Sequence, residues 1–420
     1  MSSRKRRDFI KRSATTLLGI TVIPRSLLGG PGFVPPSDRI TKGVIGAGAM
    51  GRLHIGYEGT PLVALCDVDS RQLSEASSMV RPGVKLFDDF RELLARSDVD
   101  VVHIATPPHW HSVMACMAAE AGKDIWLEVP MALAPGHSRA VMASVRKYGR
   151  VFRVNSNSRF SGRLFDNGAS VRDIKRVVDS GVLGWPLKVT LNGATGFPWH
   201  FGRMGGLSLS PEPVPEELNW EMWLGPAPYS YYNRARTHGR FRGYWDYGAG
   251  VLGERGFLYL DAIQYIIGKD GEAPVRVEVT APPQHHDVVG RWERIVFIYS
   301  DGCSINIESA AEAGEPPFIE GPEGKLFRHL RSDIPDIRRA TGTLPEPLPM
   351  ISSFSESVRT RRPFGVNEVT AHYTSLLVNM AATSLRLGRP LDFDPVKDEF
   401  TDREAERVIS RPQRPPWNII

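Results

Sequence analysis

A glycine-rich loop followed by a single carboxylate is the strongest chemical signal in this chain. The loop is Gly46-Ala47-Gly48-Ala49-Met50-Gly51 and the carboxylate is Asp67. Glycines allow a tight turn and a close approach of the backbone to a pyrophosphate, whose charge then lies at a helix N-terminus. An acid at the end of the next strand can accept hydrogen bonds from a ribose diol. Because the surrounding segments read as strand, helix and strand, the pattern predicts a dinucleotide-binding site.

The elements that would position this loop are short apolar runs alternating with amphipathic segments, from residue 40 to about 158. The expected strands are Lys42–Gly46, Leu62–Asp67, Val84–Phe87, Val101–Ala105, Ile125–Glu128 and Val151–Val154. Continuous apolar strands separated by helices predict a parallel sheet covered on both faces, and ligands bind at the carboxyl ends of such strands. We therefore expect an α/β fold with a doubly wound, NAD(P)-binding Rossmann domain over residues 35–158.

The chain changes character after about Arg159. Helices are expected at 171–180, 251–267 and 368–387, and strands at 186–192, 275–280, 294–299 and 304–309, with a long irregular segment at 193–247. Neighbouring strands without helices between them favour antiparallel pairing. The sequence thus predicts a second α/β domain over residues 159–395, with a largely antiparallel sheet, and a polar tail over 396–420.

The N-terminal residues resemble an export signal. A twin-arginine pattern, Arg6-Arg7-Asp8-Phe9-Ile10-Lys11, precedes an apolar run, Ala14 to Ile23, that is short for a membrane span. We interpret residues 1–34 as a twin-arginine leader and linker, and expect a periplasmic protein that meets a membrane only through an uncleaved leader. A disordered basic tail is the alternative.

Charge and cysteines narrow the function classes. Residues 1–30 hold seven basic residues and one acidic residue, whereas the whole chain has a net charge of +5. The remainder is nearly neutral, so charge gives no support for nucleic-acid binding. Cys66, Cys116 and Cys303 are widely spaced within apolar runs. They are typical of small core residues and indicate neither a disulfide framework nor a metal site.

Several motifs together resemble the Gfo/Idh/MocA oxidoreductase family. They include GVIGAGAMG, IATPPHWHSVMACMAAEAGKDIWLEVP, NWEMWLGPAP and YWDYGAGVLGERGFLYLD. The resemblance implies a Rossmann domain followed by an α/β domain with an open, largely antiparallel sheet, which serves as substrate wall and often as a homo-oligomer interface. Members typically oxidise or reduce a sugar or polyol hydroxyl with NAD or NADP. A carboxylate at Asp67 repels a 2′-phosphate, which favours NAD, although Arg71 lies nearby.

The same resemblance assigns roles to individual residues. Cofactor contacts are implied for Gly46, Gly48, Ala49, Met50, Gly51, Asp67, Thr106, Pro107, His109, His111 and Glu128. Catalytic roles are considered for Glu128, Glu254 and Tyr259, and substrate contacts for Arg159, His200, Arg242, Asp246 and Asp261. Structural alternatives remain for these residues, including helix-start packing for His111 and a buried structural carboxylate for Glu128. Aromatic-rich loops around Trp199, Trp220 and Trp245 suit sugar stacking, but they also suit a domain interface.

Two departures from the family pattern concern catalysis. The usual Glu-Lys-Pro reads Glu128-Val129-Pro130, and the position of the usual histidine base is Leu258. Neither valine nor leucine can take the proton that alcohol oxidation releases. One interpretation keeps an NAD-dependent oxidoreductase with a substitute base, and the candidates are Tyr259, Tyr247, Glu254, His200, Arg242 and His238. The alternatives are an NAD-dependent glycosidase that works by transient oxidation and elimination, and a catalytically silent protein that binds nucleotide or sugar.

Overall fold

The computed structural model describes residues 39–160, 162–202, 204–310 and 314–419. The expected leader, residues 1–34, lies outside these ranges. Residues Thr41–Ile420 form one compact unit that contains two sheets. Within the described ranges, no helix combines the length and the apolar character needed to cross a membrane.

The first sheet has six parallel strands in the order β3-β2-β1-β4-β5-β6. The strands are β1 (Lys42–Ile45), β2 (Leu62–Cys66), β3 (Lys85–Phe87), β4 (Val101–Ile104), β5 (Asp124–Leu127) and β6 (Phe152–Val154). The chain leaves β1 towards β2 on one side and continues with β4 on the other. This reversal creates the crevice in which doubly wound sheets bind ligands. The predicted Rossmann fold is therefore confirmed.

Several helices between these strands begin at residues that favour a helix N-terminus. The helices are α3 (Ala49–Gly56), α4 (Ser70–Ser77), α5 (Phe90–Leu94), α6 (Pro108–Glu120) and α7 (Pro135–Lys147). Asp69 caps α4 by accepting from the backbone N–H groups of Arg71 and Gln72. Proline occupies the first position of both α6 and α7, where its missing N–H costs no hydrogen bond.

The second sheet has eight strands in the order β12-β11-β7-β10-β9-β8-β13-β14. The strands are β7 (Lys188–Leu191), β8 (Arg276–Thr280), β9 (Arg294–Ile298), β10 (Ser304–Glu308), β11 (Ile319–Glu320), β12 (Lys325–Leu326), β13 (Leu391–Asp394) and β14 (Glu399–Phe400). Among the described strands of this sheet, only β7 and β10 pair in parallel, and every other pair is antiparallel. The predicted second domain, with a largely antiparallel sheet, is confirmed.

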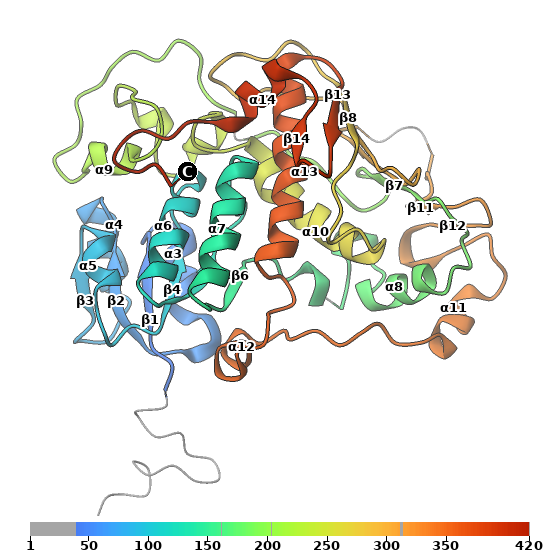
Figure 1. Ribbon diagram of the computed structural model, residues 1–420, viewed down its shortest axis with the longest axis horizontal. Coiled ribbons are helices and arrows are strands. Elements are labelled where there is room, and N and C mark those ends of the chain that lie inside the picture. Colours follow the sequence, from blue (N-terminus) through green and yellow to red (C-terminus); the bar gives the residue numbers. More distant parts are fainter. Residues whose placement is uncertain (1–38, 161, 203, 311–313, 420) are drawn as a thin grey trace, which may run out of the picture. The chain divides into compact units, whose positions relative to one another are not determined.

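Long helices connect the two sheets. Helix α13 (Glu368–Leu387) packs on α7 of the first domain and on α10 (Phe257–Ile266) of the second, as Figure 1 shows near its centre. Asn367 caps the start of α13, and Gly388, with a φ of 67°, ends it. The remaining helices are α8 (Val171–Asp179), α9 (Trp220–Leu224), α11 (Ile337–Ala340), α12 (Phe354–Thr360) and α14 (Arg403–Ser410).

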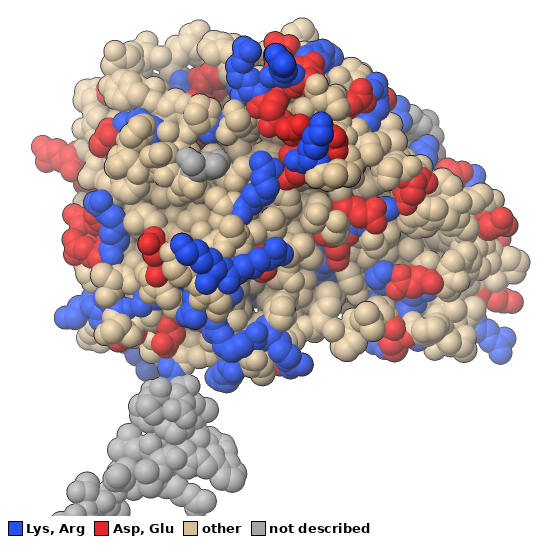
Figure 2. Space-filling view, in the orientation of Figure 1, with Lys and Arg blue, Asp and Glu red and all other residues tan. Residues whose placement is uncertain are grey.

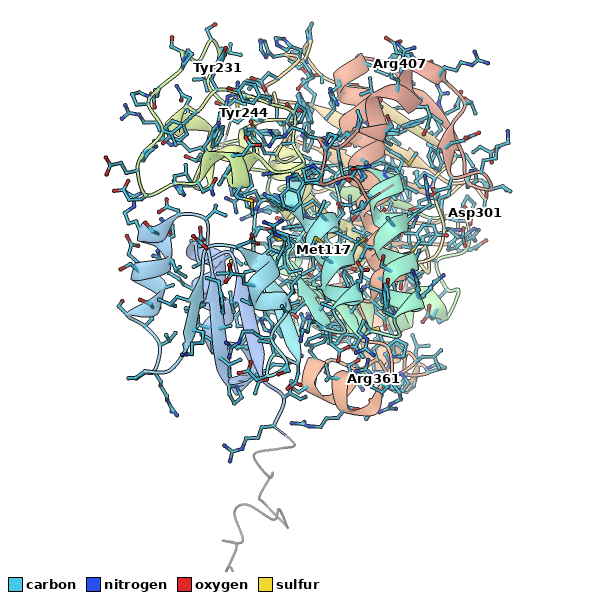
Figure 3. The ribbon with its side chains drawn as sticks, turned by 60° about the vertical axis from the view of Figure 1, so that its left-hand side comes forward. Met117, Tyr231, Tyr244, Asp301, Arg361 and Arg407 are labelled. Atoms are coloured by element: carbon cyan, nitrogen blue, oxygen red, sulfur yellow. The ribbon has the colours of Figure 1, made fainter. Side chains whose placement is uncertain are left out.

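Two segments without long elements lie against the Rossmann domain. The segment 193–247, which contains α9, hydrogen-bonds to the turn after β2 through Ser70 N to Glu217 O and Asn219 N to Val68 O. Figure 3 places Tyr231 and Tyr244 on this segment, above the strand ends. Residues of the expected tail form β14 and α14, and Trp417 then packs against Trp110 of α6. On the face drawn in Figure 2, basic and acidic side chains are interspersed.

Candidate active site

A cleft of about 1050 Å³ opens at the carboxyl ends of the Rossmann strands. One wall comes from the loops after β1, β2, β4 and β5, and the other from residues of the second domain. The first wall includes Gly46, Gly48, Ala49, Met50, Asp67, Thr106, Pro107, Glu128 and Val129. The second includes His200, Trp223, His238, Arg242, Trp245, Glu254, Leu258 and Trp292. The expected dinucleotide loop therefore faces residues that are far away in the sequence.

Each glycine of the loop meets a different requirement. Gly46 has a φ of +89°, and a Cβ there would lie 2.8 Å from the backbone of Ala105. A Cβ on Gly51 would lie 1.7 Å from the Gly46 carbonyl oxygen, so only glycine lets α3 approach β1 this closely. A Cβ on Gly48 would meet no atom within 4 Å and would enter the cleft. These are the turn, packing and backbone-approach roles of a dinucleotide loop.

The start of α3 is suited to a pyrophosphate. Gly48 is its N-cap residue and no side chain caps the first turn, so backbone N–H groups of that turn remain available to an anion. An ADP moiety would thus be held by the loop, with Ala49 and Met50 beside it on the cleft wall. The residues present fit NAD(P), which would supply a hydride acceptor at the other end of the cleft.

Asp67 stands where the ribose is expected. Its Oδ2 accepts from Ala47 N at 2.6 Å and its Oδ1 from Asp69 N at 2.8 Å, which fixes the carboxylate beside the glycine loop. Burial raises the pKa of Asp67 to about 6, and the neighbouring Asp69 adds to the rise. Arg71, which left the cofactor choice open, has an exposed side chain 3.8 Å from Asp69.

The raised pKa gives a pH prediction for cofactor binding. Above about pH 6 the ionised Asp67 would be able to accept from ribose hydroxyls, and below it the protonated acid loses an acceptor. We expect the Kd for NAD to be constant above about pH 7 and to rise about tenfold for each unit below about pH 5.5. Calorimetry across this range measures it. Asp67→Asn should bind more weakly above about pH 6 and lose this dependence, and a wild-type affinity that is flat down to pH 5 would contradict the assignment.

The loop after β4 brings two of its four expected residues to the cleft. Thr106 and Pro107 line the cleft, whereas His109 and His111 are buried outside its lining. The Nε2 atom of His109 lies 2.9 Å from the Trp223 carbonyl oxygen, and burial lowers the pKa of His109 to about 4. The ring nitrogens of His111 lie 2.7 Å from Pro130 O and 2.8 Å from Thr106 O. Both histidines therefore hold the loops that form the cleft.

Glu128 lines the cleft at the end of β5 with a side chain that is 9% exposed. Its Oε1 accepts from Asn155 Nδ2 at 2.5 Å and lies 2.6 Å from His54 Nε2. Among the described residues, Oε2 has no hydrogen-bond partner. Glu128 is thus both a held carboxylate and an acceptor available at the cleft, so its structural and functional readings are compatible.

A π-helical turn, Leu252–Gly256, presents the second domain's charged residues to the cleft. Such turns are frequent at functional sites because they redirect side chains. Within it, Glu254 forms an ion pair with Arg242 at the cleft wall. Leu258 also lines the cleft, but Tyr259 does not. The Tyr259 hydroxyl donates to Pro198 O at 3.2 Å, so it lies away from the space where a substrate would bind.

Of four other residues expected at the substrate site, one lines the cleft and three do not. The Arg159 guanidinium bonds Asp261 at 2.6 and 2.8 Å, with both side chains fully buried and outside the cleft lining. Asp246 is also outside the lining, where burial raises its pKa and Arg411 opposes the rise. His200 is exposed at the cleft wall. Arg159, Asp261 and Asp246 are therefore not brought to the substrate space, whereas His200 is.

Some residues of the cleft were not expected there from the sequence, and one base candidate lies at the ribose end. Arg52 lies on α3 and donates to Gln72 Oε1 at 2.8 Å, so two helices meet at the cleft edge. His238, considered as a base, lies 3.1 Å from Asp69 Oδ2 at the ribose end. Asn155 and Trp292 were not considered, although Asn155 directly follows β6, which was the available signal. Among the described residues, no group of three or more His, Cys, Asp or Glu could hold a metal ion.

Two family models match the chain. One, described as the NAD-binding Rossmann fold of an oxidoreductase family, covers residues 40–156. The other, described as the C-terminal alpha/beta domain of that oxidoreductase family, covers residues 167–419. Together they span both sheets and both walls of the cleft.

Curated relatives match over part of their length. A glycosyl hydrolase family 109 protein of Shewanella pealeana is 31% identical over 154 residues, which is 30% of this chain and 34% of that protein. The uncharacterized oxidoreductase YrbE of Bacillus subtilis is 31% identical over 159 residues, 37% of this chain and 45% of that protein. The chain thus spans less than half the length of these relatives.

Solved structures share the fold over most of the chain. The WlbA dehydrogenase from Chromobacterium violaceum, in complex with NADH and UDP-GlcNAcA, has a TM-score of 0.59 and 17% identity, covering 86% of this chain and 98% of that chain. The aldose-aldose oxidoreductase from Caulobacter crescentus, complexed with glycerol, has a TM-score of 0.53 and 19% identity, covering 84% and 100%. At these identities the likeness establishes the fold.

Proposed function

The chain belongs to the Gfo/Idh/MocA family of NAD-binding oxidoreductases, and on that basis we propose that it oxidises or reduces a hydroxyl of a sugar or sugar-derived substrate with NAD. One observation carries the proposal: a single cleft joins the glycine loop and Glu128 to a wall of aromatic and charged residues. A cofactor and a polyhydroxylated substrate need such an arrangement, because hydride transfer requires both in one water-poor space.

The second wall suits a sugar. Trp223, Trp245 and Trp292 line this wall, but they are only 6%, 1% and 3% exposed, so a small part of each ring is available to a sugar. The Arg242–Glu254 ion pair adds donors and acceptors for hydroxyl groups at the same wall. WlbA and the aldose-aldose oxidoreductase, which share the fold, were solved with a sugar nucleotide and with glycerol.

NAD is proposed in preference to NADP because two carboxylates, Asp67 and Asp69, lie at the ribose end. When bound, NAD would supply the hydride acceptor for the carbon that carries the hydroxyl. Glu128 Oε2 then accepts the hydroxyl proton, and Leu258 and Val129 keep water away from the reacting carbon. Glu128 thus replaces the base that the family normally supplies from the second domain.

A glycosidase that oxidises its sugar transiently is the second candidate. It is favoured by Val129 in place of the usual lysine, and by the family 109 glycosyl hydrolases among the curated relatives. In both reactions the same hydride and proton transfers come first, so the cleft supports either outcome.

One series of assays tests these functions. The purified protein is denatured and any released nucleotide is identified, and NAD affinity is measured by calorimetry. We then expect NADH to form when NAD and free sugars are added. Release of the aglycone from aryl glycosides without net NADH would instead identify the glycosidase. If neither nucleotide nor NAD affinity is found, both functions are wrong, and binding without turnover would leave a nucleotide-binding protein.

Two further parts of the proposal rest on other residues. Export by the twin-arginine route to the periplasm rests on the Arg6-Arg7 pattern. Fractionation of cells expressing the full chain and an Arg6→Lys, Arg7→Lys variant tests it, since only the wild type should reach the periplasm.

A homo-oligomer through the second sheet rests on the family resemblance, and light scattering tests it.

A further inference from the structure

A chain of buried polar side chains runs behind Glu128, away from the cleft. The Nε2 atom of His54 on α3 lies 2.6 Å from Glu128 Oε1, and its Nδ1 atom lies 2.9 Å from Nδ1 of His103 on β4. His54 is 0% exposed and His103 is 2% exposed. Positions between a parallel sheet and its covering helix are usually apolar, because burying polar groups costs free energy. This pair therefore calls for a role beyond packing.

The two contacts constrain where the ring protons lie. A carboxylate only accepts, so Nε2 of His54 donates to Oε1. The contact between the two Nδ1 atoms holds one proton, since two N–H groups would repel and two lone pairs would not bond. If His103 carries that proton, His54 is a neutral imidazole protonated at Nε2. If His54 carries it, His54 is an imidazolium ion.

Nearby cations work against a further positive charge on this pair, whereas the contact between His54 and Glu128 works for one. Lys42 on β1 donates to Tyr57 O at 2.8 Å, and the Arg153 guanidinium lies 3.7 Å from the centre of the Trp126 ring, which also packs on both imidazoles. Two cations thus already border the layer. The charged and titratable groups that face it from the packed elements are Lys42, Tyr57, Glu58, Glu128 and Arg153. Burial, with His54, Lys42 and Arg153 nearby, holds the pKa of His103 well below its usual value, so His103 is neutral in either arrangement.

We propose that His103 and His54 are positioning residues that give Glu128 its role as proton acceptor. His103 donates to Nδ1 of His54 and so fixes its tautomer. His54 and Asn155 then hold Oε1 of Glu128, which leaves Oε2 directed to the cleft. In hydrolase triads, a carboxylate holds the catalytic histidine in one tautomer by a hydrogen bond. His103 would do the same for His54.

The inference rests on the proposed function for its chemical step. The O–H bond of the substrate alcohol breaks and its proton binds Oε2 of Glu128. The C–H bond of the same carbon breaks as its hydride passes to the nicotinamide ring of NAD, so the alcohol becomes a carbonyl compound and NAD⁺ becomes NADH. The proton passes from Glu128 to water when the product is released. Asn155 donates to Oε1 of Glu128 at 2.5 Å and so also helps to hold the carboxylate in place.

The tautomer can be measured without turnover. Long-range ¹H–¹⁵N spectra of the cofactor-free, full-length protein near pH 7 should show His54 protonated at Nε2 and bare at Nδ1. In His103→Asn the amide N–H can still donate to Nδ1, so the same tautomer is expected. In His103→Leu a mixture of tautomers is expected. An Nδ1-protonated or doubly protonated His54 in the wild type would overturn the proposal.

Kinetics separate positioning from packing. His54→Leu removes the donor to Glu128, and we expect kcat to fall about a hundredfold while KM and NAD affinity change less than about twofold. His54→Gln keeps an N–H near the Nε2 position and should recover kcat to within about tenfold of the wild type. Equal losses in both variants, or no loss in either, would refute the positioning role. If the wild type oxidises no sugar, the proposed function fails, and the spectra still decide the tautomer.

Discussion

The Gly51→Ala variant is expected to lose about a hundredfold in NAD affinity and to melt at a lower temperature than the wild type. A Cβ at this position would lie 1.7 Å from the Gly46 carbonyl oxygen, so α3 must move away from the glycine loop. Overpacking against backbone costs about 3 kcal/mol. If the NAD-bound conformation of the loop bears this cost, NAD affinity falls about a hundredfold. Calorimetry with NAD and thermal denaturation measure the two effects.

Two matched glycine variants separate packing from cofactor contact. Gly48→Ala adds a methyl group that meets no atom within 4 Å, so its melting temperature should equal that of the wild type while NAD affinity falls. Gly56→Ala lies at the end of the same helix, outside the cleft lining, with equal space around it. It should keep its affinity and gain slightly in stability, because alanine is the better helix former. Wild-type affinity in Gly48→Ala would place the pyrophosphate elsewhere.

Much of the fold could be predicted because its signals are local. The apolar runs of the Rossmann strands end within a residue or two of the observed strands, and the helix expected at 368–387 has those bounds in the structure. The order of the second sheet could not be read from the sequence. Its β7 pairs with β10 and β11, which come more than a hundred residues later, and such pairings depend on tertiary contacts.

The site divides along the same line. A short strand–helix–strand unit connects the glycine loop to Asp67. Their spacing in the sequence is therefore enough to predict that the two lie next to each other. Residues chosen by chemical type fared differently. Arg159 and Asp261 form a buried ion pair outside the cleft lining, because two charges that leave water must find each other. The Tyr259 ring packs with Phe165 and Phe197, since its face of α10 points into an aromatic cluster.

The aromatic loops also show how composition alone misleads. Trp220 and Trp223 stack at 4.9 Å and belong to a buried cluster with Tyr244 and Tyr247. Within the described residues, Trp223 of this cluster lines the cleft, whereas Trp220 does not. These rings mainly anchor the segment 193–247 over the strand ends. Their contribution to a sugar site is therefore largely indirect, through Trp223 and through the wall that they support.

The Glu128→Gln variant is expected to lower kcat by about 10² to 10⁴, because the amide can accept the same hydrogen bonds at Oε1 but cannot take a proton. His54 and Asn155 keep their hydrogen-bond partner, so the melting temperature should stay close to that of the wild type. NAD affinity should change less than about twofold. Steady-state rates with a sugar that gives NADH in the assay described above, together with calorimetry, measure both quantities.

The control for this variant is Glu272→Gln, which changes an exposed acid paired with Lys269 outside the cleft lining and should leave kcat unchanged. If Glu128→Gln retains kcat within about threefold, the proton acceptor lies on the second wall, where Glu254 and His200 remain. In that case the loss of the family's usual base at Leu258 was compensated from the same domain. If kcat falls as expected, the base has moved from the second domain to the end of β5. The reaction then needs the second domain only to bind and orient its substrate, and variation of that wall could change the sugar without disturbing the proton transfer.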